Sequence, residues 1–241
     1  MSSSAETLFI SDLHLSQTKP GITQNFLTFI KTRAQNVRVL YILGDLFEVW
    51  VGDDDPAIEF ADVFHALQQL SQTTKIYFLH GNRDFLVGTA LAKRLNITML
   101  PDPYIITLGD QTIGLTHGDI LCSDDTEYLE FRASVRTELW QRDFLAKPLS
   151  ERQSIAADLR VKSLQAMQTK SLDIMDVNQK TVLETFEELD IDTLIHGHTH
   201  RPGVHITDQG RTRIVLGDWN PQASYISWKD NQLTLVDPRI N

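Results

Sequence analysis

Five short polar motifs, each directly after a short apolar run, most constrain the fold of this 241-residue chain. The runs have the β-branched and aromatic composition of strands, and the motifs offer carboxylate, amide and imidazole groups. The motifs are Asp12-Leu13-His14, Gly44-Asp45, Gly81-Asn82-Arg83-Asp84, Thr116-His117-Gly118-Asp119 and His196-Gly197-His198-Thr199-His200. Because α/β folds place their sites at the carboxyl ends of strands, we expect the five motifs to meet in one site.

Hydrophobic patterning indicates alternating strands and helices in the first half of the chain and mainly strands at its end. Strands are predicted over residues 7–10, 37–43, 75–79, 104–108, 111–115 and 193–195, and helices over residues 25–33, 55–72 and 88–95. Gly109-Asp110 predicts a hairpin turn, and two further hairpins are predicted over residues 204–216 and 225–236. This mixture predicts an α/β fold in which two sheets pack together with helices outside.

The stretch from about residue 125 to 178 breaks this pattern. Apolar side chains fall at helical spacing in two places there, at Tyr128, Phe131, Val135 and Leu139 and again at Ile155, Leu159 and Leu164. We therefore interpret residues 1–241 as a single domain with flanking helices and a helical insertion at about 125–178, between two core strands.

The charge of the chain bears on its partners. The net charge is −10, whereas proteins that bind a nucleic-acid backbone usually carry a basic surface, so no nucleic-acid partner is expected. The segment from residue 127 to 170 differs, because it holds eight basic and six acidic side chains around Leu139 and Trp140. Such a mixture suits a lipid groove or an anionic membrane surface. The alternative is an amphipathic helix pair that packs on the core.

The spacing within two of the motifs suits metal ligands. Residues two apart in a strand point the same way, so Asp12 and His14 can hold one ion together. By the same reasoning His198 can hold an ion with either His196 or His200, and the role of His200 stays open.

The other motifs complete a two-metal site. Asp45 can bridge two ions with its two oxygens, Asn82 offers a carbonyl oxygen and His117 offers an imidazole. Two divalent cations held by only two carboxylates leave the site positive, which suits hydrolysis of a phosphate ester or anhydride. The mixed donor set favours Mn²⁺, Fe²⁺, Co²⁺ or Zn²⁺ over Mg²⁺. Asp84 and Asp119 are interpreted as residues that orient ligands or close turns.

In their order, the motifs resemble those of the calcineurin-like metallophosphoesterase superfamily from residue 12 to residue 200. The resemblance implies a two-sheet α/β metallophosphoesterase sandwich with a di-metal site at one edge. It implies that one ion is held by Asp12, His14, Asp45 and His198, and the other by Asp45, Asn82, His117 and His196. The candidate catalytic residues are Asp45, Arg83 and His117.

Arg83 departs from the broad superfamily, which usually has a histidine at this position that can donate a proton to an alkoxide leaving group. Arginine cannot donate a proton near neutral pH, but it can hold phosphate oxygens as a bidentate cation. Arginine in place of histidine suits a leaving group that is already a weak base, such as a phosphate with a second pKa of about 6. A pyrophosphate bond therefore fits this position better than an alkyl phosphoester.

The local sequences resemble one family more closely. Residues 9–15, 41–48, 52–56, 80–85 and 174–178 look like the UDP-2,3-diacylglucosamine pyrophosphohydrolases of Gram-negative lipid A biosynthesis. This resemblance implies hydrolysis of the lipid substrate UDP-2,3-diacylglucosamine to UMP and 2,3-diacylglucosamine 1-phosphate, with two Mn²⁺ ions per chain. It also implies a cytoplasmic enzyme in peripheral contact with the inner membrane.

In that family the helical insertion caps the site and takes the acyl chains. The matching positions for substrate contacts are Asn82, Arg83, Asp125, Ser163, Met167, Lys170 and His196. Met167 stands where the family pattern has asparagine, which removes the polar group from that contact.

Two alternatives stay open at this point. A di-metal phosphodiesterase or nucleotide phosphatase of the same superfamily would act on a soluble substrate. A metallophosphoesterase-like scaffold would bind partners without turnover, although such scaffolds typically lose ligands and this chain keeps every expected one.

Overall fold

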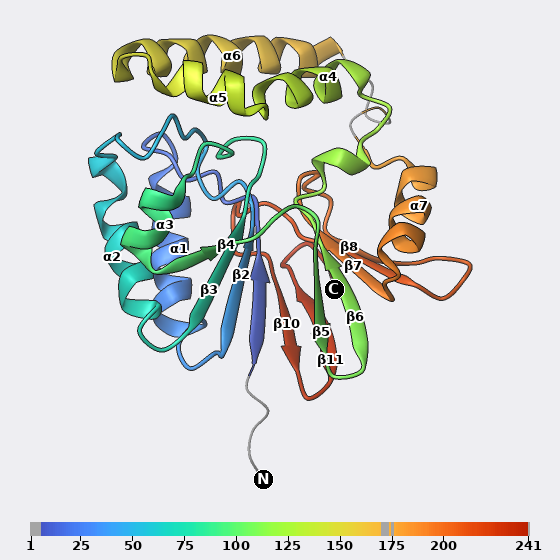
Figure 1. Cartoon of the computed structure of the whole chain (residues 1–241). Helices are drawn as coiled ribbons and strands as arrows, with labels where there is room; N and C mark the ends of the chain where they lie inside the picture. Colours follow the sequence, from blue (N-terminus) through green and yellow to red (C-terminus); the bar gives the residue numbers. More distant parts are fainter. Residues whose placement is uncertain (1–5, 170–173, 175, 241) are drawn as a thin grey trace.

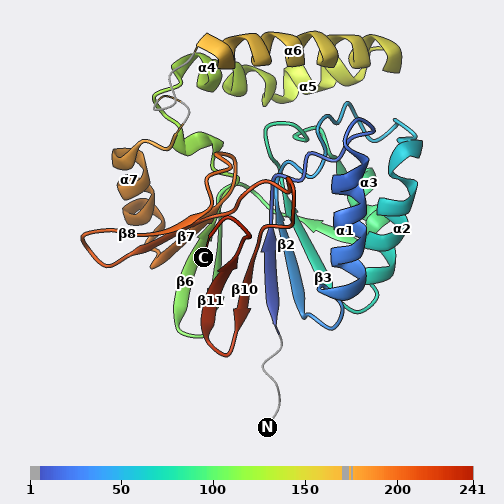
Figure 2. The same cartoon turned by 180° about the vertical axis from the view of Figure 1, so that it is seen from behind.

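Two β-sheets pack face to face at the centre of the molecule, and helices cover their outer faces (Figure 1). The computed structural model describes residues 6–169, 174 and 176–240. The predicted two-sheet α/β sandwich with flanking helices and a helical cap is confirmed. Three helices of the cap lie above the ends of the strands, on the side opposite the described N-terminal residues (Figures 1 and 2).

The first sheet has six strands in the order β11-β10-β1-β2-β3-β4. They are β1 (Thr7–Ile10), β2 (Val39–Leu43), β3 (Lys75–Leu79), β4 (Ile97–Met99), β10 (Tyr225–Lys229) and β11 (Gln232–Val236). Strands β1 to β4 are parallel, and β10 and β11 form an antiparallel hairpin beside β1. Because β1, β2 and β3 are parallel, the loops that follow them leave the same edge of the sheet.

The second sheet has five strands in the order β5-β6-β7-β9-β8. They are β5 (Tyr104–Leu108), β6 (Gln111–Leu115), β7 (Thr193–His196), β8 (Gly203–Ile206) and β9 (Thr212–Val215). Strands β5 and β6 form the predicted hairpin, in which Leu108 pairs with Gln111. Strands β6 and β7 are parallel, so the loops after them also leave one edge.

The helices fall into three groups. On the outer face of the six-stranded sheet lie α1 (Pro20–Thr32), the short 3₁₀ helix η1 (Ile58–Phe60), α2 (Ala61–Leu70) and α3 (Thr89–Leu95). Beside the five-stranded sheet lie the 3₁₀ helix η2 (Asp119–Leu121) and α7 (Gln179–Leu189). The cap consists of α4 (Thr126–Val135), α5 (Glu138–Leu145) and α6 (Leu149–Thr169). Within the described part of the chain, no helix is both long and apolar enough to cross a membrane.

Three apolar clusters hold these layers together. One lies between the six-stranded sheet and α1, α2 and α3, and includes Phe26 and Phe64. The second lies between the two sheets, where the rings of Phe9 and Tyr41 stack with centroids 5.1 Å apart. The third joins α7 to the five-stranded sheet through Phe186 and Leu194. The three clusters fix the positions of the strands, and thereby the starting points of the loops that follow them.

Some boundaries differ from the prediction for local reasons. The helix predicted from residue 55 begins instead at Ala61, after η1, because Ala57 has a left-handed backbone with φ of 43°. The Asp55 carboxylate accepts the backbone N–H of Ala57 and closes a turn there instead of capping the helix. The first helical pattern of the cap is two helices, because Thr137 caps a new helix by accepting the N–H of Trp140.

Candidate active site

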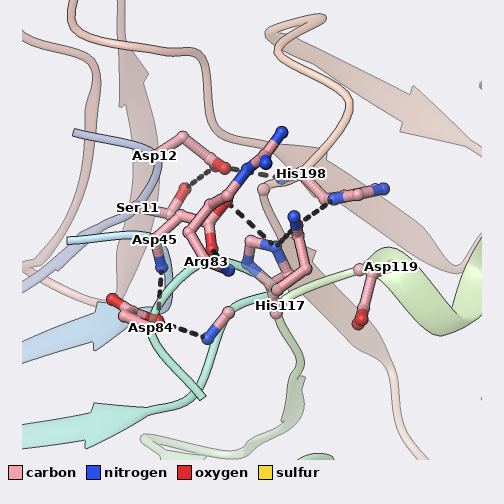
Figure 3. A network of polar contacts seen from close by, with 12 residues as sticks. Ser11, Asp12, Asp45, Arg83, Asp84, His117, Asp119 and His198 are labelled. Carbon is pink, nitrogen blue, oxygen red and sulfur yellow. Dashed lines mark hydrogen bonds and ion pairs between the residues drawn. The ribbon is translucent and has the colours of Figure 1, made fainter. Parts of the chain in front are cut away.

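Loops at the carboxyl ends of five strands bring the sequence motifs together below the cap (Figures 1 and 3). Asp12, Asp45 and His117 stand two residues after the last residue of β1, β2 and β6, respectively. His198 stands two residues after the end of β7, and Asn82 stands three residues after β3. The parallel strands of the two sheets therefore deliver the donors of all five loops to a common point.

Five of the donors stand on left-handed turns of the backbone. The angle φ is 55° at Asp12, 50° at His14, 52° at Asp45, 65° at His198 and 55° at His200. This conformation costs a non-glycine residue on the order of 1–3 kcal/mol and persists where the surroundings fix it. The strand alternation invoked for Asp12 and His14 therefore does not apply, because these residues lie beyond the strand in a turn.

Asp84 fixes the loop that carries Asp45 (Figure 3). Its buried carboxylate accepts hydrogen bonds from the backbone N–H groups of Gly81 (2.9 Å), Asp45 (3.2 Å) and Leu46 (2.7 Å). Burial and the nearby charge of Asp45 raise the pKa of Asp84 to about 6. A Cβ on Gly81 would lie 2.0 Å from Asp45 Oδ1, so glycine is required there. Asp84 closes the turn, as the sequence predicted.

One group of donors comprises Asp12, His14 and His200. The Nε2 atom of His200 lies 3.3 Å from Asp12 Oδ1 and 3.2 Å from His14 Nε2. The Asp12 Oδ2 atom accepts hydrogen bonds from the Ser11 hydroxyl and from the backbone N–H of His198. These bonds fix the carboxylate so that its other oxygen, Oδ1, faces the two imidazoles.

The other group comprises Asn82, His117 and His198. The carboxamide of Asn82 lies 3.0 Å from His117 Nε2 and 3.0 Å from His198 Nδ1. On its far side, the His117 ring is oriented by a 2.9 Å contact between Nδ1 and the carbonyl oxygen of Leu43. The Asp45 Oδ2 atom lies 3.8 Å from His117 Nε2 and 3.6 Å from His14 Nε2, so it stands between the two groups.

The donors fit a pair of divalent cations. Asp12 Oδ1 is buried and receives no hydrogen bond of good geometry from the described residues. Burial alone would lower the pKa of His117, but the carboxylates of Asp45 and Asp12 raise it to about 9. Positive charge is therefore favoured at this point. The ligand atoms of Asp12, Asp45 and His117 lie within 4.8 Å of one another, as do those of Asp12, His14 and His200.

His196 is the predicted ligand that the structure does not bring into either group. Its buried ring is occupied at both nitrogens, with Nε2 3.1 Å from Arg213 Nη1 and Nδ1 2.8 Å from the carbonyl oxygen of Gly197. Burial and the neighbouring Arg213 charge lower the pKa of His196 to about 3. Instead, His198 lies beside Asn82, and His200 lies beside His14 and Asp12.

A regularity in the sequence distinguishes these histidines. Asp12, Asp45 and His117 each come two residues after a strand, and His196 is itself the last residue of β7. The same rule selects His198, and His200 then follows at the spacing that separates His14 from Asp12. The rule depends on β7 ending at His196; the predicted strand ended at residue 195, so the sequence alone could not have applied it.

A cavity of about 160 Å³ opens beside the first donor group. Asp12, His14, His200 and Arg83 line it from the sandwich, and Arg160 and Leu164 line it from α6 of the cap. Arg83 therefore lies beside the first donor group, and its role in holding phosphate oxygens stays a prediction. Arg160 was not predicted, because a single arginine among the eight basic residues of the cap carries no distinguishing sequence signal.

The other predicted substrate residues are spread over the cap. Asp125 caps α4 by accepting the backbone N–H of Tyr128 at 3.1 Å, and Ser163 lies half-buried on α6 beside Leu164. Lys170 and the side chain of Met167 lie outside the described part of the chain.

Asp119 ties the cap to the sandwich. Its buried carboxylate accepts hydrogen bonds from the Tyr128 hydroxyl and from Arg132 Nε (2.7 Å), both on α4. The Tyr128 ring stacks on the ring of His198, with centroids 6.1 Å apart and an interplanar angle of 28°. Asp119 therefore orients a neighbour of the donor cluster and is not itself a donor, in keeping with its predicted role.

Comparison with known proteins gives a consistent picture. The family model for calcineurin-like phosphoesterases matches residues 6–202. A protein from Enterobacter sp. strain 638, described as UDP-2,3-diacylglucosamine hydrolase, is 46% identical over 95% of this chain and 98% of its own length. A protein of the same description from Aromatoleum aromaticum is 47% identical over 92% of each chain. Among solved structures, vacuolar protein sorting 29 from Cryptosporidium parvum aligns with a TM-score of 0.49 and 13% identity, covering 97% of this chain and 96% of that one.

Proposed function

Because the chain belongs to the calcineurin-like phosphoesterase family, we propose that it hydrolyses the pyrophosphate bond of UDP-2,3-diacylglucosamine. The products are UMP and 2,3-diacylglucosamine 1-phosphate, and the reaction belongs to lipid A biosynthesis. One observation carries the proposal: relatives described as UDP-2,3-diacylglucosamine hydrolase match this chain at 46–47% identity over nearly its whole length. The complete donor set and Arg83 beside it agree with that chemistry.

Two cations have distinct sets of ligands in this proposal. One set is Asp12, His14, Asp45 and His200, and the other is Asp45, Asn82, His117 and His198. When bound, the cations supply Lewis acidity to the phosphate and lower the pKa of the attacking water. We take Mn²⁺ as the metal, because it accepts imidazole nitrogen together with carboxylate and amide oxygen.

The protein groups have separate tasks. Asp45 holds both halves of the site, since one of its oxygens lies between His14 and His117. The carbonyl oxygen of Leu43 contacts His117 Nδ1 and so orients the ring, which leaves Nε2 facing the other donors. Arg83 lines the cavity next to these donors and holds phosphate oxygens as negative charge builds up on them.

The cap is proposed to hold the lipid part of the substrate. Arg160 and Leu164 of α6 line the cavity from above, so the cap offers both a cation and an apolar side chain to the bound molecule. Asp125, Ser163 and Lys170 remain the proposed head-group contacts of the cap. His196 is left out of the proposed contacts, because it is buried beneath the site. In this proposal residues 1–241 act as one domain, with the cap as its insertion at about 125–178.

We extend the proposal to peripheral contact with the cytoplasmic face of the inner membrane. Several large apolar side chains of the cap are exposed: Phe131, Leu139, Leu145, Val161 and Leu164. They stand among the basic residues of a segment that is richer in cations than the rest of the chain. Apolar and cationic groups together favour an anionic lipid surface. Co-sedimentation with phosphatidylglycerol vesicles but not with phosphatidylcholine vesicles would support this contact.

UMP release from UDP-2,3-diacylglucosamine, with and without Mn²⁺, tests the main proposal. We expect release that requires Mn²⁺ and that the variant Asp45→Ala lacks. A bis-nucleoside polyphosphate and a cyclic nucleotide serve as alternative substrates. Cleavage of one of these without release of UMP from the lipid would reject the proposed substrate while keeping the metal site.

A further inference from the structure

Glu48 lies between a metal-facing histidine and a helix of the cap. Its Oε2 atom is 3.4 Å from His14 Nδ1, and its Oε1 atom is 2.8 Å from Arg160 Nη2. Glu48 follows β2 and belongs to the sandwich, whereas Arg160 lies in the middle of α6. The three side chains, all of which line the cavity, therefore connect the cap to the donor cluster.

The two nitrogens of His14 have different neighbours. Nε2 faces the donor cluster, 3.2 Å from His200 Nε2 and 3.6 Å from Asp45 Oδ2, whereas Nδ1 faces Glu48. A carboxylate that accepts the proton of one imidazole nitrogen leaves the lone pair of the other nitrogen aimed at the metal position. Glu48 Oε2, 3.4 Å from Nδ1, acts on this nitrogen through its charge and without a hydrogen bond of good geometry, and its charge favours the tautomer with the proton on Nδ1.

Arg160 supplies the charge that keeps Glu48 in place. The side chains are mostly shielded, with 19% of Glu48 and 28% of Arg160 exposed, so their ion pair is less screened than one on an open surface. If α6 moved away, Glu48 would lose this partner and would face Arg83 and solvent. The ring of His14 would then lose part of what orients it.

We propose that Glu48 is a positioning residue that couples the seating of cap helix α6 to the affinity of the His14 half of the site for its cation. The coupling is reciprocal, since a contact that strengthens metal binding in the seated state must also favour seating when metal is bound. Substrate that holds the cap down would thereby tighten the metal on which its own hydrolysis depends. The inference uses the metal site of the proposed function but not the identity of the lipid.

Metal affinity measured without substrate tests this coupling. Mn²⁺ is titrated into the metal-free full-length protein, and free Mn²⁺ is followed by electron paramagnetic resonance. We expect Glu48→Gln to weaken one of two Mn²⁺ sites by about 10–100-fold, which is typical for loss of a partner behind a ligand. Arg160→Gln should weaken the same site by about fivefold, at the low end of coupling between sites.

A double variant makes the test specific. Because Arg160 acts through Glu48, adding Arg160→Gln to Glu48→Gln should weaken Mn²⁺ binding no further. Arg160→Lys, which keeps the charge, should bind more tightly than Arg160→Gln. The matched control is Arg142→Gln on α5, whose side chain is 73% exposed and pairs with its neighbour Asp143. This control should bind Mn²⁺ as the wild type does.

Three results overturn the inference. They are wild-type Mn²⁺ affinity in Arg160→Gln, wild-type affinity in Glu48→Gln, and an additional loss when Arg160→Gln is combined with Glu48→Gln. A wild-type protein that binds no Mn²⁺ would instead reject the proposed metal centre. A wild-type protein that binds two Mn²⁺ ions but releases no UMP would reject the lipid and leave the coupling to be decided by the variants.

Discussion

The sandwich side and the cap side of the cavity are built in different ways. On the sandwich side, backbone hydrogen bonds and buried carboxylates fix each donor, as Asp84 does for the loop of Asp45. The cap is tied to that side by individual side-chain contacts, such as Arg160 with Glu48 and Arg136 with the carbonyl oxygen of Gly81. In the proposed function, the sandwich supplies the groups for the chemistry and the cap selects the substrate, apart from the metal affinity that Arg160 adjusts through Glu48.

The large apolar side chains of the cap are also less completely buried than those of the sandwich. From the cap, Phe144 is buried in the core of the six-stranded sheet, with Trp140 stacked on it at 4.8 Å between centroids. Leu139 and Leu145 from the same helix stay exposed. The cap is therefore docked through apolar residues of α5 and α6, while other large apolar side chains of the cap stay exposed. A change in this contact should affect substrate binding more than it affects the donors in the sandwich.

The largest effect is expected at the centre of the sandwich side. Asp45→Ala removes the carboxylate that stands between both donor groups, so neither cation would keep its full set of ligands. We expect UMP release to fall by more than about a thousandfold, beyond the loss of one preorganised donor. Initial rates at saturating Mn²⁺ measure this. Activity within tenfold of the wild type would show that the two groups do not depend on a shared ligand.

Arg83→Ala should have the next largest effect. We expect a loss of roughly 3 kcal/mol in transition-state stabilisation, or about a hundredfold in kcat/KM, as for one electrostatic donor. Steady-state kinetics on the lipid substrate measure it, with Arg83→Lys as the control that keeps charge but not the bidentate fork. Unchanged kinetics in Arg83→Ala would mean that the cap, and not the sandwich, holds the phosphates.

Sequence reasoning succeeded where a local pattern determines the structure. The hairpin at Gly109-Asp110 was predicted because the two-residue turn is encoded in the residues themselves. The five motifs were predicted to meet because parallel strands deliver their following loops to one edge. Both inferences need only the chain direction and the position of the strand ends.

Sequence reasoning failed where the backbone departs from regular helix or strand geometry. Spacing left open whether His196 or His200 joins His198, and the family resemblance implied His196 and His198; in the structure His198 and His200 stand on left-handed turns beside the other donors. Likewise, no local signal predicts that Arg160 meets Glu48, because their approach depends on how the cap docks. Side-chain contacts between distant segments follow from the fold and cannot be read from spacing.

A pair of histidine variants tests this assignment. His200→Ala should lose one bound Mn²⁺ and lower UMP release by about 10–100-fold at moderate Mn²⁺, the range of altered metal affinity. His196→Ala should keep both ions but lower the free energy of unfolding by about 1–3 kcal/mol, because Arg213 loses a buried acceptor. Metal analysis and thermal unfolding of the same samples measure both. Loss of an ion from His196→Ala alone would restore the assignment implied by the family resemblance.

The smallest effect on chemistry is expected from the anchor of the cap. Arg152 is 1% exposed and donates hydrogen bonds to the carbonyl oxygens of Val51 and Lys147, and it pairs with Asp54, which is 64% exposed. Since the exposed partner adds little, the expected loss from Arg152→Ala comes mainly from the two carbonyls left unpaired, each about 1–3 kcal/mol. We expect this loss to loosen the cap locally.

Arg152→Ala should therefore separate binding from chemistry. At saturating Mn²⁺, which removes any effect of cap seating on metal occupancy, we expect KM for the lipid to rise severalfold, while kcat with a small phosphodiester that needs no cap stays near the wild-type value. Arg142→Ala, on the exposed face of α5, is the matched control and should change neither constant. A fall in kcat on the small substrate would contradict the division of labour between sandwich and cap, because it would show that the cap also holds the chemical groups in place.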